Sequence, residues 1–245
     1  MFIGQDYLLV EPRATVELRS ILFKDILCII PMKDVQEAKK RLRRAFSDDK
    51  QAIVSSLVSQ LFVSTITNVR ELFDFAVVSP SDDILDIALD SGASFVYQDL
   101  GIDLNDALRT CINYFIHLNK YKAVFILTAD LPFLTTQSLK LLISNTNPST
   151  FFILSAPKKG SELQGTSGLL IPIHRWPSIE LEFGTNSFNK FIQQFIRLEV
   201  EFKSSNDIMG FDLDEVSDLQ VMRNLIFDKM GSVAPYLHEQ ILLLQ

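Results

Sequence analysis

Short, continuously apolar runs recur along the first two thirds of the chain and alternate with segments of helical periodicity. The runs lie at 26–31, 73–79, 94–98, 123–128 and 151–156. Between them, apolar residues recur at helical spacing over 48–69, 82–91, 104–119 and 135–145. Continuous apolarity is typical of strands covered on both faces, and strands that alternate with helices form parallel sheets. The pattern predicts an α/β fold with a mostly parallel sheet and helices on both faces.

The pattern changes after residue 156. A loop at 157–168 leads into an apolar segment at 168–172. The later segments predict a helix over 187–197, strands over 198–203 and 208–213, a helix from about 215 and a last helix over 233–244. At roughly 150 residues per domain, the 245 residues suit one large α/β domain. We interpret residues 1–24 as an N-terminal extension, 25–230 as a single domain and 231–245 as a C-terminal helical tail.

One segment, 51–69, has nineteen uncharged residues and is long enough to suggest a membrane span. Serine, threonine, asparagine and glutamine interrupt it, and its apolar residues fall at helical spacing, so we predict an amphipathic core helix. Cys28 and Cys111 lack metal-ligand spacing, which is consistent with free thiols in a reducing compartment. No signal-peptide pattern opens the chain. We therefore expect a cytoplasmic protein that does not associate with membranes.

Charge is unevenly distributed. The chain has 30 acidic and 23 basic side chains, a net charge of −7, which argues against nucleic-acid binding because that needs a basic surface. Residues 33–44 nevertheless hold six basic and two acidic side chains. A basic segment in an acidic chain favours a small anionic ligand over a long nucleic acid.

Ligands of open parallel sheets bind beyond the carboxyl ends of the strands, so the residues that follow each strand are the first candidates for chemistry. Lys33 and Lys39 follow the first predicted strand and can bring two ammonium groups to one anion; the alternative is a solvated basic loop. Asp130 follows the fourth, where a carboxylate can bind Mg²⁺ carried by a nucleotide; the alternative is a turn or a cap of the helix near 135.

Two further groups of residues lie later in the chain. Asp212 and Asp214 project to the same side if 208–213 is a strand, and such a pair is costly unless it is solvated or binds a cation. The alternative is that one of them caps the next helix. The loops 165–168 and 183–188 combine small residues with hydroxyls, which suits a phosphate or carboxylate site but also ordinary turns and caps. No histidine or nucleophile motif supports hydrolytic chemistry.

Taken in order, these motifs resemble those of the CofC/FbiD family of 2-phospho-L-lactate (or phosphoenolpyruvate) guanylyltransferases, over about residues 26–222. They are Ile30-Pro31-x-Lys33, Ala38-Lys39-x-Arg41-Leu42, Leu104-Asn105-x-Ala107-Leu108, Ala129-Asp130-Leu131-Pro132, Gly165-Thr166, Phe183-Gly184-x-x-Ser187-Phe188, and Asp212-x-Asp214 followed by Asp218-Leu219. The family's usual Gly-Thr-Asn reads Gly165-Thr166-Ser167 here, and Thr185-Asn186 replace a Pro-Gly pair. These substitutions lie where acceptor specificity would be set.

The resemblance implies a Rossmann-like, nucleotide-diphosphosugar transferase (MobA-like) fold and transfer of GMP from GTP to a small phospho-acid in coenzyme F(420) biosynthesis. It implies one or two Mg²⁺ bound by Asp130 and Asp212, with Asp214 as the alternative. It also implies phosphates bound by Lys33 and Lys39, with Arg41 a further candidate or a structural partner. Asn105 is a candidate nucleotide contact, and the acceptor would be held by Thr166, Gly184 and Ser187. The alternatives are a related nucleotidyltransferase with a molybdopterin or sugar-phosphate acceptor, or a catalytically lapsed nucleotide-binding relative. Residues 1–24 and 233–244 are candidates for a homodimer contact.

Overall fold

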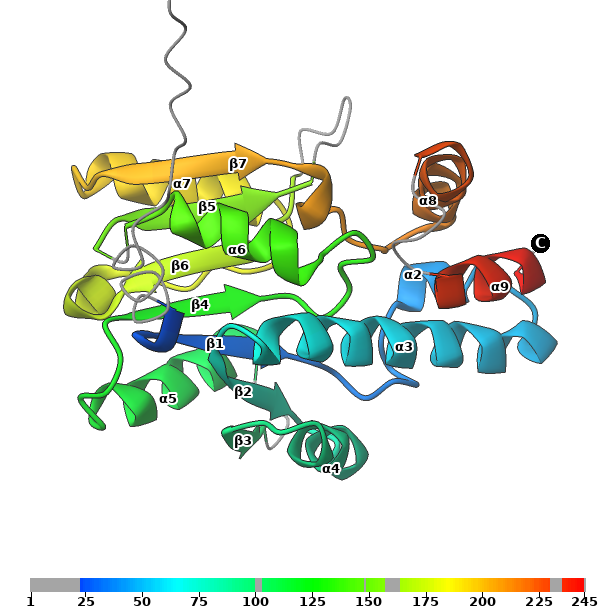
Figure 1. The fold of residues 1–245 in the computed structure, drawn as a ribbon, viewed down its shortest axis with the longest axis horizontal. Helices are drawn as coiled ribbons and strands as arrows, with labels where there is room; N and C mark the ends of the chain where they lie inside the picture. Colours follow the sequence, from blue (N-terminus) through cyan, green and yellow to red (C-terminus); the bar gives the residue numbers. More distant parts are fainter. Residues whose placement is uncertain (1–22, 100–102, 148, 157–163, 230–234, 245) are drawn as a thin grey trace, which may run out of the picture.

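The computed structural model of the chain describes residues 23–99, 103–147, 149–156, 164–229 and 235–244 (Figure 1). Residues 1–22 of the predicted extension and the first two residues of the predicted 233–244 helix lie outside this part. So do positions 157–163 of the predicted loop at 157–168.

A single sheet of seven strands forms the centre of the described structure, in the order β3-β2-β1-β4-β6-β5-β7. The strands are β1 (Ile26–Pro31), β2 (Asp74–Ser79), β3 (Phe95–Gln98), β4 (Ala123–Leu127), β5 (Phe151–Ser155), β6 (Gly168–Pro172) and β7 (Phe202–Asn206). β6 pairs antiparallel with β4 and β5, and the other pairings are parallel. The first five predicted strands are confirmed to within one residue, and so is the mostly parallel sheet.

Helices cover both faces of this sheet (Figure 1). They are α2 (Lys40–Arg43), α3 (Gln51–Arg70), α4 (Asp82–Asp90), α5 (Leu104–Ile116), α6 (Thr136–Ser144), α7 (Ser187–Arg197), α8 (Val216–Lys229) and α9 (Pro235–Leu243), with 3-10 turns η1 (Asp48–Lys50), η2 (Ile173–Ser178) and η3 (Ile208–Gly210). Successive strand residues point to opposite faces. Cys28 therefore packs on the side of α3, α4 and α6, and Leu27 on the side of α5 and α7.

The long helix α3 is apolar enough to span a membrane by length and composition. In the fold it is a core helix, as its periodicity predicts: eight of its residues are buried, and seven of these, including Val54, Phe62 and Ile66, belong to the hydrophobic cluster on one face of the sheet. α9 packs on it, with Leu237 and Ile241 buried there, so part of the apolar tail is used within the chain.

The prediction of a strand at 198–203 is wrong at its start. Leu198 is the C-cap of α7, and Glu199 follows in the left-handed region with φ 51°. The amides of Glu199 and Val200 donate to the carbonyls of Ile196 and Phe195, at 3.1 and 3.2 Å. This is the Schellman arrangement that ends a helix. Residues 198–200 are thus occupied by the helix terminus, and β7 begins only at Phe202.

Candidate functional site

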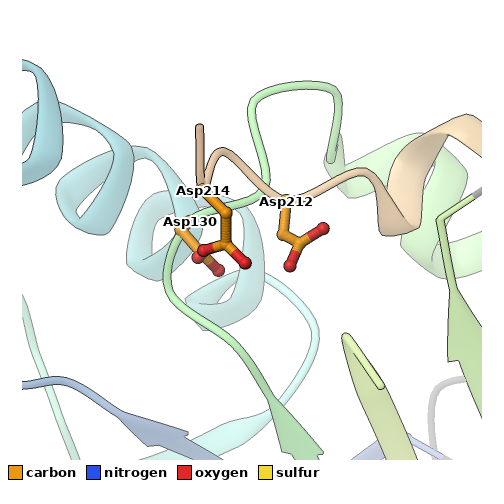
Figure 2. Close-up of side chains that lie close together, drawn as sticks. All are labelled: Asp130, Asp212 and Asp214. Carbon is orange, nitrogen blue, oxygen red and sulfur yellow. The ribbon is translucent and has the colours of Figure 1, made fainter. Parts of the chain in front are cut away.

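Three carboxylates from two distant segments meet beyond the carboxyl end of β4 (Figure 2). Asp130 follows β4, whereas Asp212 and Asp214 lie between η3 and α8. One oxygen of each lies within 4.8 Å of the others. The amide of Leu213 donates to the Asp130 carbonyl at 3.4 Å, which joins the two segments at this point. The sequence-predicted metal ligands are therefore brought together.

The prediction of a strand over 208–213 is wrong, but Asp212 and Asp214 still project to the same side. Residues 208–210 form η3, which Asp207 caps by accepting the Met209 amide at 3.1 Å. Phe211 then leaves η3 in an extended conformation, and Leu213, between the two aspartates, is fully buried. In extended backbone, residues two apart project to the same side, with or without a partner strand. Asp212 and Asp214 consequently share a side.

Lys39 supplies a positive charge to this cluster. Its ammonium donates to Asp130 Oδ2 and, at 2.8 Å, to Asp214 Oδ1, with 12% of its side chain exposed. Burial alone would lower the pKa of Lys39, but the Asp130 and Asp214 carboxylates outweigh it and raise the pKa above its ordinary value. Lys39 is therefore charged at neutral pH and neutralises part of the carboxylate cluster.

Three buried polar atoms at this edge have no hydrogen-bond partner among the described residues: Asp130 Oδ1, Thr128 Oγ1 and Thr166 Oγ1. Buried polar atoms are normally satisfied, so their concentration here indicates a place for a ligand or ordered water. Carboxylate oxygens are the donors that Mg²⁺ prefers, and Asp130 has one oxygen to offer beside the one that Lys39 contacts. The residues present fit a divalent cation.

A second cluster of predicted residues forms where α7 begins. The Thr166 amide donates to Ser187 Oγ at 2.8 Å, and the Ser187 amide donates to the Gly184 carbonyl at 3.1 Å. Gly184 has φ 123°, which only glycine adopts readily. Ser167, which follows Thr166 in the chain, accepts a hydrogen bond from the Thr128 amide through its carbonyl and donates one from its hydroxyl to the Gly210 carbonyl. One short loop therefore connects the Thr166–Ser187 cluster with the segments that carry the carboxylates.

The sequence matches a known protein family. The sequence profile of the family described as "guanylyl transferase CofC like" matches residues 26–230. The chain belongs to this family.

The chain is also similar to individual relatives in this family, and its fold is similar to that of a solved structure. The chain is 25% identical to the 2-phospho-L-lactate guanylyltransferase of Methanobrevibacter smithii, over 80% of this chain and 82% of that one. It is 25% identical to the phosphoenolpyruvate guanylyltransferase of Sphaerobacter thermophilus, over 79% and 90%. The fold resembles that of a Desulfovibrio desulfuricans protein assigned as a nucleotide-diphospho-sugar transferase, with TM-score 0.66, 16% identity and coverage of 90% and 97%. The predicted fold is confirmed.

Within this CofC-like chain, the basic segment 33–44 is largely engaged in contacts with the protein itself. Besides Lys39, Lys40 pairs with Glu37 at 2.7 Å, and Arg41 pairs with Glu215 at 3.0 Å. Arg43 lies inside the segment and donates to the carbonyls of Val35 and Ala38 at 2.5 and 2.8 Å. Much of the positive charge of this segment is therefore balanced within the protein. Lys33, which is exposed, and Lys39 stay the predicted phosphate contacts.

Asn105 has a structural role that its motif does not reveal. Its Oδ1 accepts the Phe183 amide at 2.8 Å, and its Nδ2 donates to the Phe183 carbonyl at 3.3 Å. These bonds attach the start of α5 to the loop that leads to Ser187. Its contact with a nucleotide stays a prediction, and residues 100–102 of the adjoining loop lie outside the described part.

Thr128 is a site residue that the sequence argument missed. Its place directly after β4 was the available signal, since residues there face the ligand edge. A threonine after an apolar strand nevertheless continues the β pattern, and only the structure reveals that its hydroxyl is buried without a partner among the described residues.

Gly210 packs so closely that no side chain fits, which predicts a stability effect next to the carboxylates. A Cβ there would lie 2.7 Å from the Ser155 carbonyl oxygen, which is backbone and cannot rotate away. We expect Gly210→Ala to lower the free energy of unfolding by about 1–3 kcal/mol in urea denaturation. Gly165→Ala is the matched control because its Cβ would meet nothing within 4 Å. Equal unfolding free energies for the two variants would contradict the packing argument.

Proposed function

We propose that this chain is a Mg²⁺-dependent guanylyltransferase that transfers GMP from GTP to a small phosphorylated carboxylic acid and releases pyrophosphate. The acceptor would be 2-phospho-L-lactate, phosphoenolpyruvate or 3-phosphoglycerate, and the pathway coenzyme F(420) biosynthesis. The observation that carries the proposal is the meeting of Asp130, Asp212 and Asp214 with Lys39 in a chain of the CofC-like family.

In this reaction a phosphate oxygen of the acceptor attacks the α-phosphorus of GTP. A new O–P bond forms, and the bond between the α-phosphorus and its bridging oxygen breaks, with pyrophosphate leaving with the electron pair. The acceptor phosphate is already ionised near neutral pH, so no side chain has to remove a proton. The protein's task is therefore to bring two polyanions together and to stabilise the charge that develops.

The described residues divide this task. Asp130, with Asp212 and Asp214, would hold Mg²⁺, which supplies charge neutralisation to the phosphates when bound. Lys39 and the exposed Lys33 would neutralise further phosphate oxygens. Both lysines follow β1, the strand beside β4, so their backbone starts from the same edge of the sheet as Asp130.

Thr166, Gly184 and Ser187 would hold the acceptor. The Thr166 hydroxyl, which has no partner among the described residues, is a suitable donor for a carboxylate or phosphate. The positive end of the α7 helix dipole favours an anion there. Ser187 is 1% exposed and its hydroxyl accepts from the Thr166 amide, which fixes the loop against the helix.

An acceptor screen tests this function. The purified full chain is incubated with Mg²⁺ and each of the four NTPs against 2-phospho-L-lactate, phosphoenolpyruvate and 3-phosphoglycerate, and the products are identified by mass spectrometry. We expect a guanylylated phospho-acid and stoichiometric pyrophosphate with GTP. Turnover only with another nucleotide would reject the guanylyltransferase assignment. Turnover only with a sugar phosphate or molybdopterin, added as further acceptors, would reject the phospho-acid acceptor. Well-folded protein that binds no NTP with Mg²⁺ would indicate a lapsed relative.

A further inference from the structure

We propose that Lys39 is a tethered counter-ion that exchanges with the divalent cation: its ammonium occupies the carboxylate cluster in the ligand-free protein and leaves it when metal and nucleotide bind. This inference rests on the proposed function, because it assigns a phosphate group as the second partner of Lys39. It concerns binding rather than chemistry, and so it can be tested without turnover.

The first step is the position of the ammonium. Lys39 Nζ contacts Asp130 Oδ2 and Asp214 Oδ1, two of the three carboxylates that would ligate a cation. A divalent cation held by the same three carboxylates would lie close to this ammonium, even where Asp130 offers its other oxygen, Oδ1. Two positive charges so close together repel strongly in a partly buried site, so the ammonium and the metal compete for the cluster.

The second step is what the carboxylates require when no metal is bound. The cluster places three negative charges close together, on Asp130, Asp212 and Asp214, and each of these residues is partly buried. Like charges so close together repel one another. An internal ammonium neutralises part of this charge, so the site can exist before any ligand arrives, but any arriving cation must compete with it.

The third step is that Lys39 can move without its backbone. Its backbone lies in the left-handed region, φ 58° and ψ 44°, at the N-cap of α2. A non-glycine residue stays there only where its surroundings impose it, and Arg43 supports the preceding turn through the carbonyls of Val35 and Ala38. The fixed Cα carries a flexible four-carbon stem. Rotation of that stem moves the ammonium from the carboxylates to a phosphate without rearranging the fold.

The consequence is coupling. Metal alone must expel Lys39 into solvent, whereas metal with a triphosphate gives the ammonium a new anionic partner. Each ligand therefore strengthens the binding of the other, and by thermodynamic linkage the effect is reciprocal. Free divalent cations bind the empty site weakly, and the nucleotide–metal pair binds well.

The test is Mn²⁺ binding to the full chain without nucleotide, measured by electron paramagnetic resonance of free Mn²⁺. Lys39→Met keeps the stem and removes the charge, and we expect it to bind Mn²⁺ at least about tenfold more tightly than the wild type, the size of a moderate coupling. Lys40→Met is the matched control: Lys40 is the next residue, is exposed and pairs with Glu37. It should leave Mn²⁺ affinity unchanged. Equal or weaker Mn²⁺ binding by folded Lys39→Met would overturn the exchange and make Lys39 a fixed structural cation.

A second measurement needs no variant. The rate at which Lys39 of the wild-type chain is acylated is followed by mass spectrometry of the labelled peptide. The rate without Mn²⁺ is compared with the rate at Mn²⁺ concentrations that saturate binding. Release from the carboxylates should raise this rate severalfold while the rate at Lys40 stays constant. An unchanged Lys39 rate at saturation would contradict the proposal. Neither measurement uses GTP or an acceptor, so failure of the acceptor screen and failure of the exchange are separate results.

Discussion

We expect Asp130→Asn to slow Mg²⁺-dependent release of pyrophosphate from GTP on the order of a hundredfold or more. Asp130 is the one carboxylate of the three that comes from the parallel core of the sheet, and its Oδ1 is buried without a partner among the described residues. An amide keeps the shape but removes a negative charge, so it holds a divalent cation far less well. The rate is measured with GTP and the acceptor identified in the screen.

Asp207→Asn is the control for this experiment. Asp207 is a neighbouring aspartate in the segment that leads to Asp212, but it caps η3 by accepting the Met209 amide, a role that asparagine also fills. Its rate should stay near that of the wild type. Near wild-type turnover by folded Asp130→Asn would reject the metal assignment of Asp130, whereas equal losses in both variants would point to a general effect on the segment.

The first half of the fold was predictable because burial on both faces leaves a plain trace in the sequence. β1 is uninterrupted apolar sequence between Lys24-Asp25 and Lys33, and its predicted bounds equal those observed. β7 leaves no such trace. Its sequence, Phe-Lys-Ser-Ser-Asn, is polar and partly exposed because it lies at the sheet edge and pairs with β5 alone. Pattern arguments fail where a strand is held by backbone pairing rather than by burial.

The site was predictable in its components but not in their pairings. Asp130, Asp212 and Asp214 were identified from their positions after strands or in extended segments, and they do gather. Lys39 lies 91 residues from Asp130 and 175 from Asp214, and no local pattern links residues so far apart. The sequence therefore presents Asp212 and Asp214 as a pair without a basic neighbour, while the fold supplies Lys39 and Arg41 from the segment after β1.

Arg43 is the clearest case of a residue whose role depends on the fold. Charge alone places it with the phosphate-binding candidates, yet its guanidinium faces inward. It donates to the carbonyls of Val35 and Ala38, and also to Ser55 Oγ at 3.0 Å on α3. Arginine suits this role because its planar fork presents several donors in fixed directions. It ties the turn that carries Lys39 to a core helix.

We expect Arg43→Ala to lower the free energy of unfolding by about 2 kcal/mol. Several hydrogen bonds from a charged donor are lost, and water only partly satisfies the carbonyl acceptors that remain. Arg43→Lys should recover little of this, since a lysine offers one point charge instead of a fork. The adjacent Arg44 is exposed, and Arg44→Ala should change the value by less than about 0.5 kcal/mol. Urea denaturation of the four proteins gives these differences. Hydrogen exchange at residues 35–40 should also accelerate in Arg43→Ala alone; similar stability and exchange in the Arg43 and Arg44 variants would show that the turn is held by other contacts.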